Sequence, residues 1–203
     1  MSQIALPFSK PAQERPERIV IGNGNAGVAD ALANSENWPF RTAVLVGPAR
    51  SGKSILAQWF ASHTGGGALD DADLREEDEV FHAWNRAQED GYPLLLTVSG
   101  QKWTIALPDL ASRIGSALQL AIAQPDDAMA ADLLEAHASQ LGLPIGEGAA
   151  PYLVPRMERS YAAIEEIVLA IDRLCLERKA PATMSVWRDA LETVQGPKQG
   201  RLL

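Results

Sequence analysis

Between Thr42 and Ser54 the chain reads TAVLVGPARSGKS. The first part, Thr42–Val46, is apolar and rich in β-branched residues, which is typical of a strand buried on both faces of a parallel sheet. The second part, Gly47–Ser54, fits the pattern G-x-x-x-x-G-K-[ST]. Apolar residues then recur at helical spacing over 53–63. A strand before the motif and a helix after it favour a phosphate-binding loop over a chance glycine-rich turn.

The chemistry of this loop follows from its residue types. Glycines allow backbone N–H groups to curl around phosphates, and the helix N-terminus adds positive potential. Lys53 is long enough to reach the β- and γ-phosphates, and the Ser54 hydroxyl is a ligand for Mg²⁺. We therefore expect ADP or ATP with Mg²⁺ as cofactors, without a preference between the two nucleotides. The expected nucleotide-binding residues of the loop are Gly47, Pro48, Ala49, Arg50, Ser51, Gly52, Lys53 and Ser54.

A magnesium-nucleotide site also needs an acidic element, and Asp70-Asp71 follows a short apolar segment. We expect Asp70 to share the metal with Ser54 and Asp71 to polarise a water molecule. An alternative is a solvated acidic face, because residues 70–90 hold nine acidic and two basic side chains. The glycines at 65–67 are also poor strand formers, so both readings stay open.

Composition limits the classes of protein that fit. The 203 residues are 46% apolar and 22% charged, as in ordinary globular proteins. A net charge of −8 opposes direct binding to a phosphate backbone. Cys175 is the only cysteine, which excludes an internal disulfide and a cysteine-based zinc site. No run of eighteen apolar residues is present and the N-terminus does not resemble a signal peptide, so we expect a cytoplasmic protein without membrane contact.

The periodicity of the apolar residues changes along the chain. Strand and helix patterns alternate over 19–123, which predicts an α/β domain with a parallel sheet. Purely helical periodicity over 124–196 predicts an all-α domain, with residues 1–18 as a flexible tether and 197–203 as a frayed tail. Expected helix caps are Asp126, Ser160 and Ser185 at N-termini and Gly142 at a C-terminus.

The distance between the two phosphate-site motifs is short. Only sixteen residues separate Lys53 from Asp70, which suffices for one helix and a return connection but not for a further strand and helix. We therefore expect a sheet of four strands, from which one edge unit of the usual phosphate-loop fold is missing.

Several segments together resemble the AAA+ ATPases of the bacterial replication-initiator group, and within it the Hda-type proteins, small homologues of the initiator DnaA that act in its regulatory inactivation. The similar segments are Ile19–Asn25 on the adenine side, Gly47–Ser54 as Walker A, Leu69–Asp71 as Walker B, Leu95–Ser99 as the sensor 1 strand, and Leu107–Arg113. The resemblance implies a shortened AAA+ nucleotide-binding domain followed by a helical lid.

The resemblance also implies roles for single residues. Ile21 contacts the nucleotide base, and Ser99 is the sensor 1 residue. Arg113 ends a segment similar to the family's L-x-S-R motif, whose arginine is the finger offered to a neighbour's ATP. A solvated helix arginine is the alternative for Arg113. The family's lid arginine, sensor 2, aligns with Ala162, and Arg159 lies one turn away as a candidate replacement. Without it, hydrolysis by this chain itself would be weak or dependent on a partner.

The N-terminus carries a second motif. Residues 3–8 read QIALPF and resemble the hexapeptide with which Hda-type proteins bind the replicative sliding clamp. Gln3 supplies amide hydrogen bonds, Leu6 and Phe8 suit an apolar pocket, and Pro7 restricts the free peptide so that less entropy is lost on docking.

These observations lead to a functional hypothesis. The chain is a clamp-tethered, nucleotide-binding regulator of chromosome replication initiation that promotes hydrolysis of initiator-bound ATP through Arg113. Its expected partners are the sliding clamp and the initiator DnaA, without direct sequence-specific DNA binding, and self-association stays open. One alternative is an adaptor between clamp and initiator with a relic nucleotide site. Another is a small-molecule phosphate-loop kinase, for which no acceptor pocket is evident.

The clamp motif can be tested by itself. We expect the combined change Gln3→Ala, Leu6→Ala and Phe8→Ala to abolish clamp binding, because it removes the amide and both pocket-filling side chains. Surface plasmon resonance on immobilised clamp measures the loss. The far-ultraviolet circular dichroism should not change, since the segment lies outside both expected cores. Undiminished clamp affinity would refute the assignment.

Overall fold

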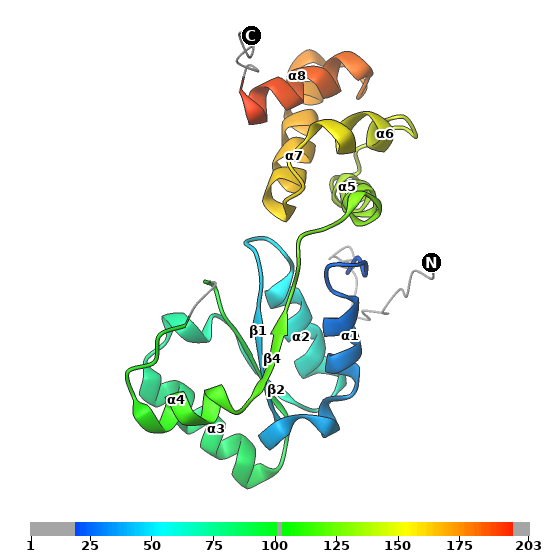
Figure 1. Ribbon diagram of the computed structural model, residues 1–203. Coiled ribbons are helices and arrows are strands. Elements are labelled where there is room, and N and C mark those ends of the chain that lie inside the picture. Colours follow the sequence, from blue (N-terminus) through cyan, green and yellow to red (C-terminus); the bar gives the residue numbers. More distant parts are fainter. Residues whose placement is uncertain (1–18, 101–102, 197–203) are drawn as a thin grey trace, which may run out of the picture. The chain divides into compact units, whose positions relative to one another are not determined.

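The computed structural model describes residues 19–100 and 103–196 (Figure 1). The described chain divides into two compact units. An α/β unit spans Gly24–Ala123, and a helical unit combines residues 19–23 with residues 124–196. The expected clamp-binding residues Gln3, Leu6, Pro7 and Phe8, the tether 1–18 and the tail 197–203 lie outside the described residues.

The α/β unit is built on a sheet of four parallel strands. They are β1 Thr42–Val46, β2 Gly67–Leu69, β3 Leu94–Thr97 and β4 Leu118–Ala121, in the order β2-β3-β1-β4. Strand β1 pairs with both β3 and β4, so it has a neighbour on each side. This confirms the expected shortened parallel sheet, and β1 occupies the central position that its apolar sequence predicts.

Helices cover both sides of this sheet, with α1 and α2 on one side and α3 and α4 on the other (Figure 1). On the first side, Phe60 is fully buried and its ring stacks on Trp38 at 5.1 Å between centroids. On the second side, Val80 and Leu110 pack with the strand residue Leu96 in one cluster. The helical segments of this unit are α1 Ala26–Ala33, η1 Ser35–Asn37, η2 Pro39–Arg41, α2 Lys53–His63, η3 Ala72–Leu74, α3 Glu77–Asp90 and α4 Pro108–Gly115.

Helix α2 is followed directly by β2, so the edge unit between them is missing, as expected. The glycines of this connection have a packing role. A Cβ atom at Gly66 would lie 2.6 Å from the Phe60 ring, and one at Gly67 would lie 2.8 Å from the Tyr92 ring. Both distances are too short for a side chain. Gly66 and Gly67, which are poor strand formers by propensity, are therefore required by the close approach of two aromatic rings.

The helical unit contains α5 Asp127–Leu141, α6 Ala149–Leu153, η4 Val154–Arg156, α7 Tyr161–Arg178 and α8 Met184–Gln195. Its core is formed by fully buried aliphatic residues of α5 and α7, including Leu134, Ile164 and Ile167, against Trp187 of α8. Three expected caps are confirmed. Asp126 accepts a hydrogen bond from Met129 N at 2.8 Å, Ser160 accepts one from Ala163 N at 3.2 Å, and Gly142 ends α5 with φ 67°. None of the helices in the described ranges is both long and apolar enough to cross a bilayer.

The first described residues belong to the helical unit, which differs from the expected boundary of a nucleotide-binding domain at residue 19. Asn23 Oδ1 accepts a hydrogen bond from Asp126 N at 3.0 Å. Gly22 lies so close to Met129 that a Cβ atom there would be 2.7 Å from its side chain. Contacts between residues about a hundred positions apart decide this placement, and no local pattern reveals them.

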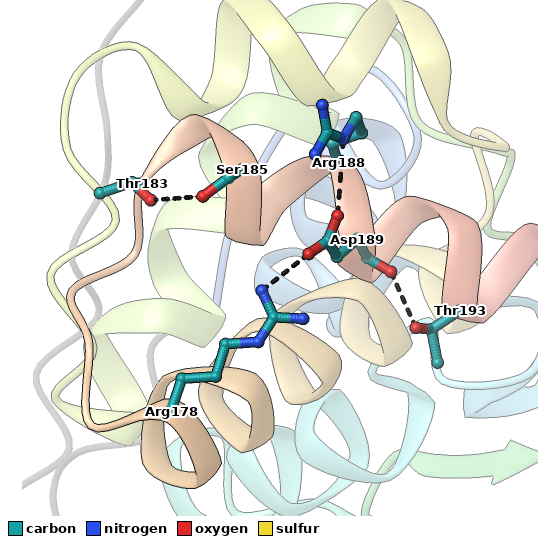
Figure 2. A network of polar contacts seen from close by, with 6 residues as sticks. All are labelled: Arg178, Thr183, Ser185, Arg188, Asp189 and Thr193. Atoms are coloured by element: carbon teal, nitrogen blue, oxygen red, sulfur yellow. Dashed lines mark hydrogen bonds and ion pairs between the residues drawn. The ribbon is translucent and has the colours of Figure 1, made fainter.

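Ser185 does not cap α8, in contrast to the sequence-based expectation. Helix α8 begins at Met184 and its N-cap is Thr183, whose Oγ1 lies 3.0 Å from Ser185 Oγ (Figure 2). Figure 2 also shows that Arg178 at the end of α7 donates to Asp189 of α8, with 2.7 Å between Nη1 and Oδ2. This hydrogen bond is the main reason why the pKa of Asp189 is lowered. The Arg178–Asp189 ion pair between α7 and α8 is therefore lost when Asp189 is protonated, as the pH falls through that lowered pKa.

Because Asp126 caps a helix and Ser185 does not, replacing each by alanine should change the free energy of unfolding by different amounts. Asp126→Ala should lower the free energy of unfolding by about 1 kcal/mol, because an orphan backbone donor loses its acceptor. Ser185→Ala should change it by less than about 0.5 kcal/mol, since no backbone donor of α8 depends on that hydroxyl. Urea denaturation of both variants measures the difference. Equal losses would contradict the cap assignment.

Candidate functional site

The phosphate loop connects the end of β1 to the start of α2. Two of its residues adopt positive φ angles, 63° at Arg50 and 84° at Gly52. Gly52 is the N-cap of α2, which begins at Lys53 as the sequence predicts. The loop therefore delivers the backbone to the N-terminus of an eleven-residue helix, where free N–H groups and the helix dipole favour an anion.

Gly47 and Ser51 shape the inner wall of the loop. A Cβ atom at Gly47 would lie 2.9 Å from Ile122 Cβ and 3.0 Å from Ser51 Oγ, so a side chain cannot be accommodated there. Ser51 is 6% exposed, and its hydroxyl has no hydrogen-bond partner among the described residues. A buried hydroxyl without a partner is energetically costly, and a phosphate oxygen is a suitable acceptor for it.

The Lys53 ammonium lies at the mouth of the same loop. Its Nζ donates to Gly47 O and Pro48 O, each at 3.0 Å, and the residue is only 9% exposed. The two carbonyls hold the ammonium where loop and helix meet. The loop thus combines an orphan hydroxyl, a glycine that must lack a side chain and a nearly buried cation, and these features fit a nucleotide phosphate group.

The carboxyl ends of β2 and β3 bring the acidic pair next to a threonine. Thr97 Oγ1 donates a hydrogen bond to Asp70 Oδ1 and accepts one from Asp71 N at 2.9 Å. Asp71 itself has φ 49° in the left-handed region. Sequence reasoning missed Thr97, although a hydroxyl at the carboxyl end of an otherwise apolar buried strand is a readable signal. Thr97 therefore fixes both aspartates relative to the strand.

Ser99, the expected sensor 1 residue, contacts a different acid. Its Oγ donates to Asp73 Oδ2 at 2.6 Å and its backbone N donates to Asp73 Oδ1 at 2.7 Å. Burial raises the pKa of Asp73, but these bonds and one from Gly100 N outweigh burial, so the pKa lies below its usual value. Ser99 thus anchors Asp73, whereas the threonine two positions earlier contacts the acidic pair.

Two carboxylates of the acidic stretch 70–90 accept hydrogen bonds from backbone N–H groups. A solvated acidic face would not make such bonds. Asp73 captures Ser99 and Gly100, and Glu77 accepts from Ala106 N at 2.7 Å and from Leu107 N at 2.6 Å. The two carboxylates therefore fix both ends of the segment that leads into α4. Other acids of the stretch, Glu76, Asp78 and Glu79, are exposed as a solvated face predicts.

The metal-binding expectation rests on oxygen donors. Ser54 is exposed at the second position of α2, and Asp70 is half-buried. Hydroxyl and carboxylate oxygens are the donors that Mg²⁺ prefers. Within the described ranges no group of three His, Cys, Asp or Glu side chains could hold a metal ion. Any Mg²⁺ here would therefore depend on phosphate and water oxygens for most of its ligands.

Arg113 lies on α4 and contacts α3. Its guanidinium carbon is 4.6 Å from the Phe81 ring centroid and 4.3 Å from that of Trp84. Nη1 donates to Asn85 Oδ1 at 2.6 Å, and Nη2 lies 3.7 Å from Asp109 Oδ2. The side chain is 28% exposed. Arg113 is thus a stacked and hydrogen-bonded arginine and not a fully solvated one, and its role as a finger stays a prediction.

Two further expected nucleotide contacts, Ile21 and Arg159, lie in the helical unit. Ile21 is half-buried in the segment 19–23. Arg159 Nε is 2.6 Å from Asp127 Oδ1, and both side chains are well exposed. The residue aligned with the family's lid arginine, Ala162, is half-buried in the first turn of α7. Their nucleotide roles stay predictions.

Comparison with solved structures identifies the fold. Domain III of the replication initiation protein DnaA from Thermotoga maritima superposes with a TM-score of 0.73, over 88% of this chain and 95% of that one, at 13% identity. The Holliday junction branch migration motor RuvB from the same organism gives 0.61, over 84% and 69%, at 16% identity. DnaA bound to AMPPCP and single-stranded DNA gives 0.58, over 79% and 66%, at 17% identity. No protein-family model matches the chain, and no curated protein matches it either.

The chain therefore has the AAA+ P-loop NTPase fold, with a four-stranded parallel sheet flanked by helices. The alignment with DnaA domain III covers 88% of this chain, so it includes residues of both units. At these identities the likeness concerns the fold, and the chemistry has to be argued from the residues of the site.

The phosphate loop yields a binding prediction. ADP or ATP with Mg²⁺ at a hundred times its Kd should stabilise the protein by about 2.7 kcal/mol, which raises the Tm by roughly 5–10 °C for a chain of this size. Lys53→Ala should abolish the shift, because the phosphate loop loses its cation. Differential scanning fluorimetry measures both, with Gln58→Ala on the exposed side of the same helix as the control. A wild-type protein without any shift at millimolar nucleotide would contradict the prediction.

Proposed function

We propose that this protein is a nucleotide-binding regulator of replication initiation, which presents Arg113 to the ATP of a DnaA-type initiator and promotes its hydrolysis. The fold shared with DnaA domain III supports a replication-related role. A sliding clamp is the proposed tether through residues 3–8, and the cytoplasm is the proposed location. The initiator and the clamp are the proposed partners, and a homo-oligomer remains compatible with the proposal.

One observation carries this proposal. The contacts of Arg113 come from α3 and from its own helix, at Phe81, Trp84, Asn85 and Asp109, whereas the phosphate loop has its own cation in Lys53. A second cation held on a different pair of helices is suited to a nucleotide other than the one in its own loop. In this proposal Lys53 serves the chain's own nucleotide and Arg113 serves the nucleotide of the partner.

The proposed chemistry needs only one positioned side chain. In phosphoryl transfer the catalytic effect comes mainly from positioning and from stabilising charge on the transferring group. An arginine supplied in trans is worth roughly 10³ to 10⁵ in rate in GTPases. The planar guanidinium can give two parallel hydrogen bonds to phosphate oxygens, which an ammonium group cannot do.

The chain's own nucleotide has a regulatory part in this proposal. The phosphate-loop residues and Ser54 hold it, Asp70 is the proposed metal-side carboxylate, and Asp71 is the proposed water-polarising group. Ser99 acts indirectly, through its hydrogen bonds to Asp73. Own hydrolysis is proposed to be weak, because Ala162 stands where the family's lid arginine aligns.

An adaptor with a relic nucleotide site is the second candidate. The observation in its favour is the ion pair between Arg159 and Asp127 at 2.6 Å. A carboxylate beside the arginine that would replace the lid arginine opposes phosphate binding at that position. The adaptor would bind clamp and initiator without catalysing the initiator's hydrolysis, so it differs from the regulator in a single measurable rate.

That rate gives the decisive prediction. Arg113→Ala should slow hydrolysis of initiator-bound ATP by roughly two orders of magnitude or more, because the transition-state charge loses its positioned cation. Arg113→Lys should rescue it poorly, since a compact ammonium lacks the planar fork. The measurement is single-turnover loss of radiolabelled ATP from the initiator on clamp-loaded DNA, at equal clamp occupancy.

The control for this experiment is the protein's own binding. Nucleotide affinity and clamp affinity should be unchanged in Arg113→Ala, because the printed sequence of the clamp motif and of the phosphate loop does not include Arg113, and its described contacts lie on α3 and α4. Exposed Arg86 on α3 provides a matched loss of one positive charge through Arg86→Ala. Equal rates for wild type, Arg113→Ala and Arg113→Lys would remove the catalytic role and favour the adaptor.

A further inference from the structure

The Arg113 guanidinium contacts three residues of α3. Two aromatic rings, Phe81 and Trp84, lie within 4.6 Å of its carbon, and Asn85 Oδ1 accepts a 2.6 Å hydrogen bond from Nη1. Phe81, Trp84 and Asn85 are called the Arg113 cradle below. Sequence motifs did not reveal it, because its members lie 28 to 32 positions before Arg113 in the chain.

The cradle is itself held in place. Phe81 and Trp84 pack against the buried cluster that contains Val80, Leu96 and Leu110. The core between the sheet and the helices α3 and α4 therefore holds both rings in place. The Trp84 indole N–H has no hydrogen-bond partner within the described ranges, so this ring contributes through its face and its packing. A support anchored in this way can fix the arginine that it contacts.

The backbone that carries Arg113 is fixed by the same helix. Glu77, one turn before Phe81 on α3, accepts hydrogen bonds from Ala106 N and Leu107 N, immediately before α4. Positions 77, 81, 84 and 85 follow the spacing i, i+4, i+7 and i+8, which places them on one face of α3. One helix face thus sets both the start of α4 and the head group of Arg113.

This arrangement leaves the chemistry of the guanidinium available. Stacking on aromatic rings occupies the faces of the group, whereas its N–H donors lie in the plane. Asn85 takes one donor, and Asp109 is 3.7 Å from Nη2. The side chain remains 28% exposed. The cradle therefore limits the rotamers of a long side chain and still leaves it partly accessible.

We propose that Phe81, Trp84 and Asn85 are positioning residues that preorganise Arg113 for the phosphates of a partner's ATP. This inference rests on the proposed function. An arginine that is already ordered loses less conformational entropy when it meets a phosphate group in the transition state. The cradle therefore acts on the rate of the chemical step, whereas the affinity for the partner is set elsewhere.

The test uses the full-length chain in the single-turnover assay with clamp-loaded DNA and ATP-bound initiator. Trp84→Leu and Asn85→Ala should each slow hydrolysis by about fivefold to tenfold, with unchanged half-saturation by the regulator. Trp84→Phe should keep most of the rate, because it restores a ring face and removes an N–H that has no partner. The exposed residue Glu89 on the same helix provides the matched control, and Glu89→Ala should react like the wild type.

A double mutant separates positioning from general loss of structure. In the Arg113→Ala background, Trp84→Leu and Asn85→Ala should cause no further loss, because the side chain they position is absent. Nuclear magnetic resonance gives a readout that is independent of the partner. The Nε–H resonance of Arg113 should be shifted upfield by the ring currents, and Trp84→Leu should remove much of that shift while the methyl signals of the core persist.

The outcomes distinguish a failure of the positioning role from a failure of the proposed function. If Arg113→Ala slows hydrolysis and the cradle variants react at the wild-type rate, the positioning role is refuted and the proposed function stands. A faster rate in Trp84→Leu or Asn85→Ala also refutes it, because the cradle would then withhold the arginine. If Arg113→Ala has no effect, the proposed function and this inference fail together.

Discussion

The site depends on one close approach, that of Gly47 to Ile122. The backbone at Gly47 lies so near Ile122 Cβ that no side chain fits between them. The loop can therefore turn at the end of β1 and enter α2 with Lys53 folded onto the carbonyls of Gly47 and Pro48. Since β1 is paired with both β3 and β4, the loop is anchored to a strand that has a hydrogen-bonded neighbour on each side. The remaining polar groups of the site are arranged around this fixed point.

Acidic residues after β2 connect this point to the rest of the α/β unit. Asp70 and Asp71 are fixed by Thr97 at the end of β3, and Asp73 and Glu77 fix the segment between β3 and α4. The acidic stretch thus has a structural function that its composition does not show. The carboxylates of Asp73 and Glu77 are stabilised by hydrogen bonds from backbone N–H groups. The same stretch continues as α3, whose face contacts Arg113.

The helical unit is stabilised by apolar packing and by helix caps. Its stability comes from aliphatic packing between α5, α7 and α8 and from caps at Asp126 and Ser160. Residues 19–23 join it through Gly22 and Asn23, so the chain enters and leaves the α/β unit next to each other, at Gly24 and Ala123, which share a hydrogen bond. In the order of the chain, the α/β unit is therefore inserted into the helical unit.

The sequence by itself determined the local elements. Thr42–Val46 and Lys53–His63 form the strand and helix that their patterns predict, and the short distance from Lys53 to Asp70 predicts the missing edge unit. These features depend on periodicity, glycine positions and chain length, which are readable locally. Only the tertiary structure decided which distant residues meet. Thr97 contacts Asp70, and Ser99 contacts Asp73. Residues 19–23 join the helical unit, and Arg113 stacks on Phe81 and Trp84. Each of these joins positions at least 26 residues apart, and such pairs are set by strand order and by helix packing on the sheet, which no window of sequence contains.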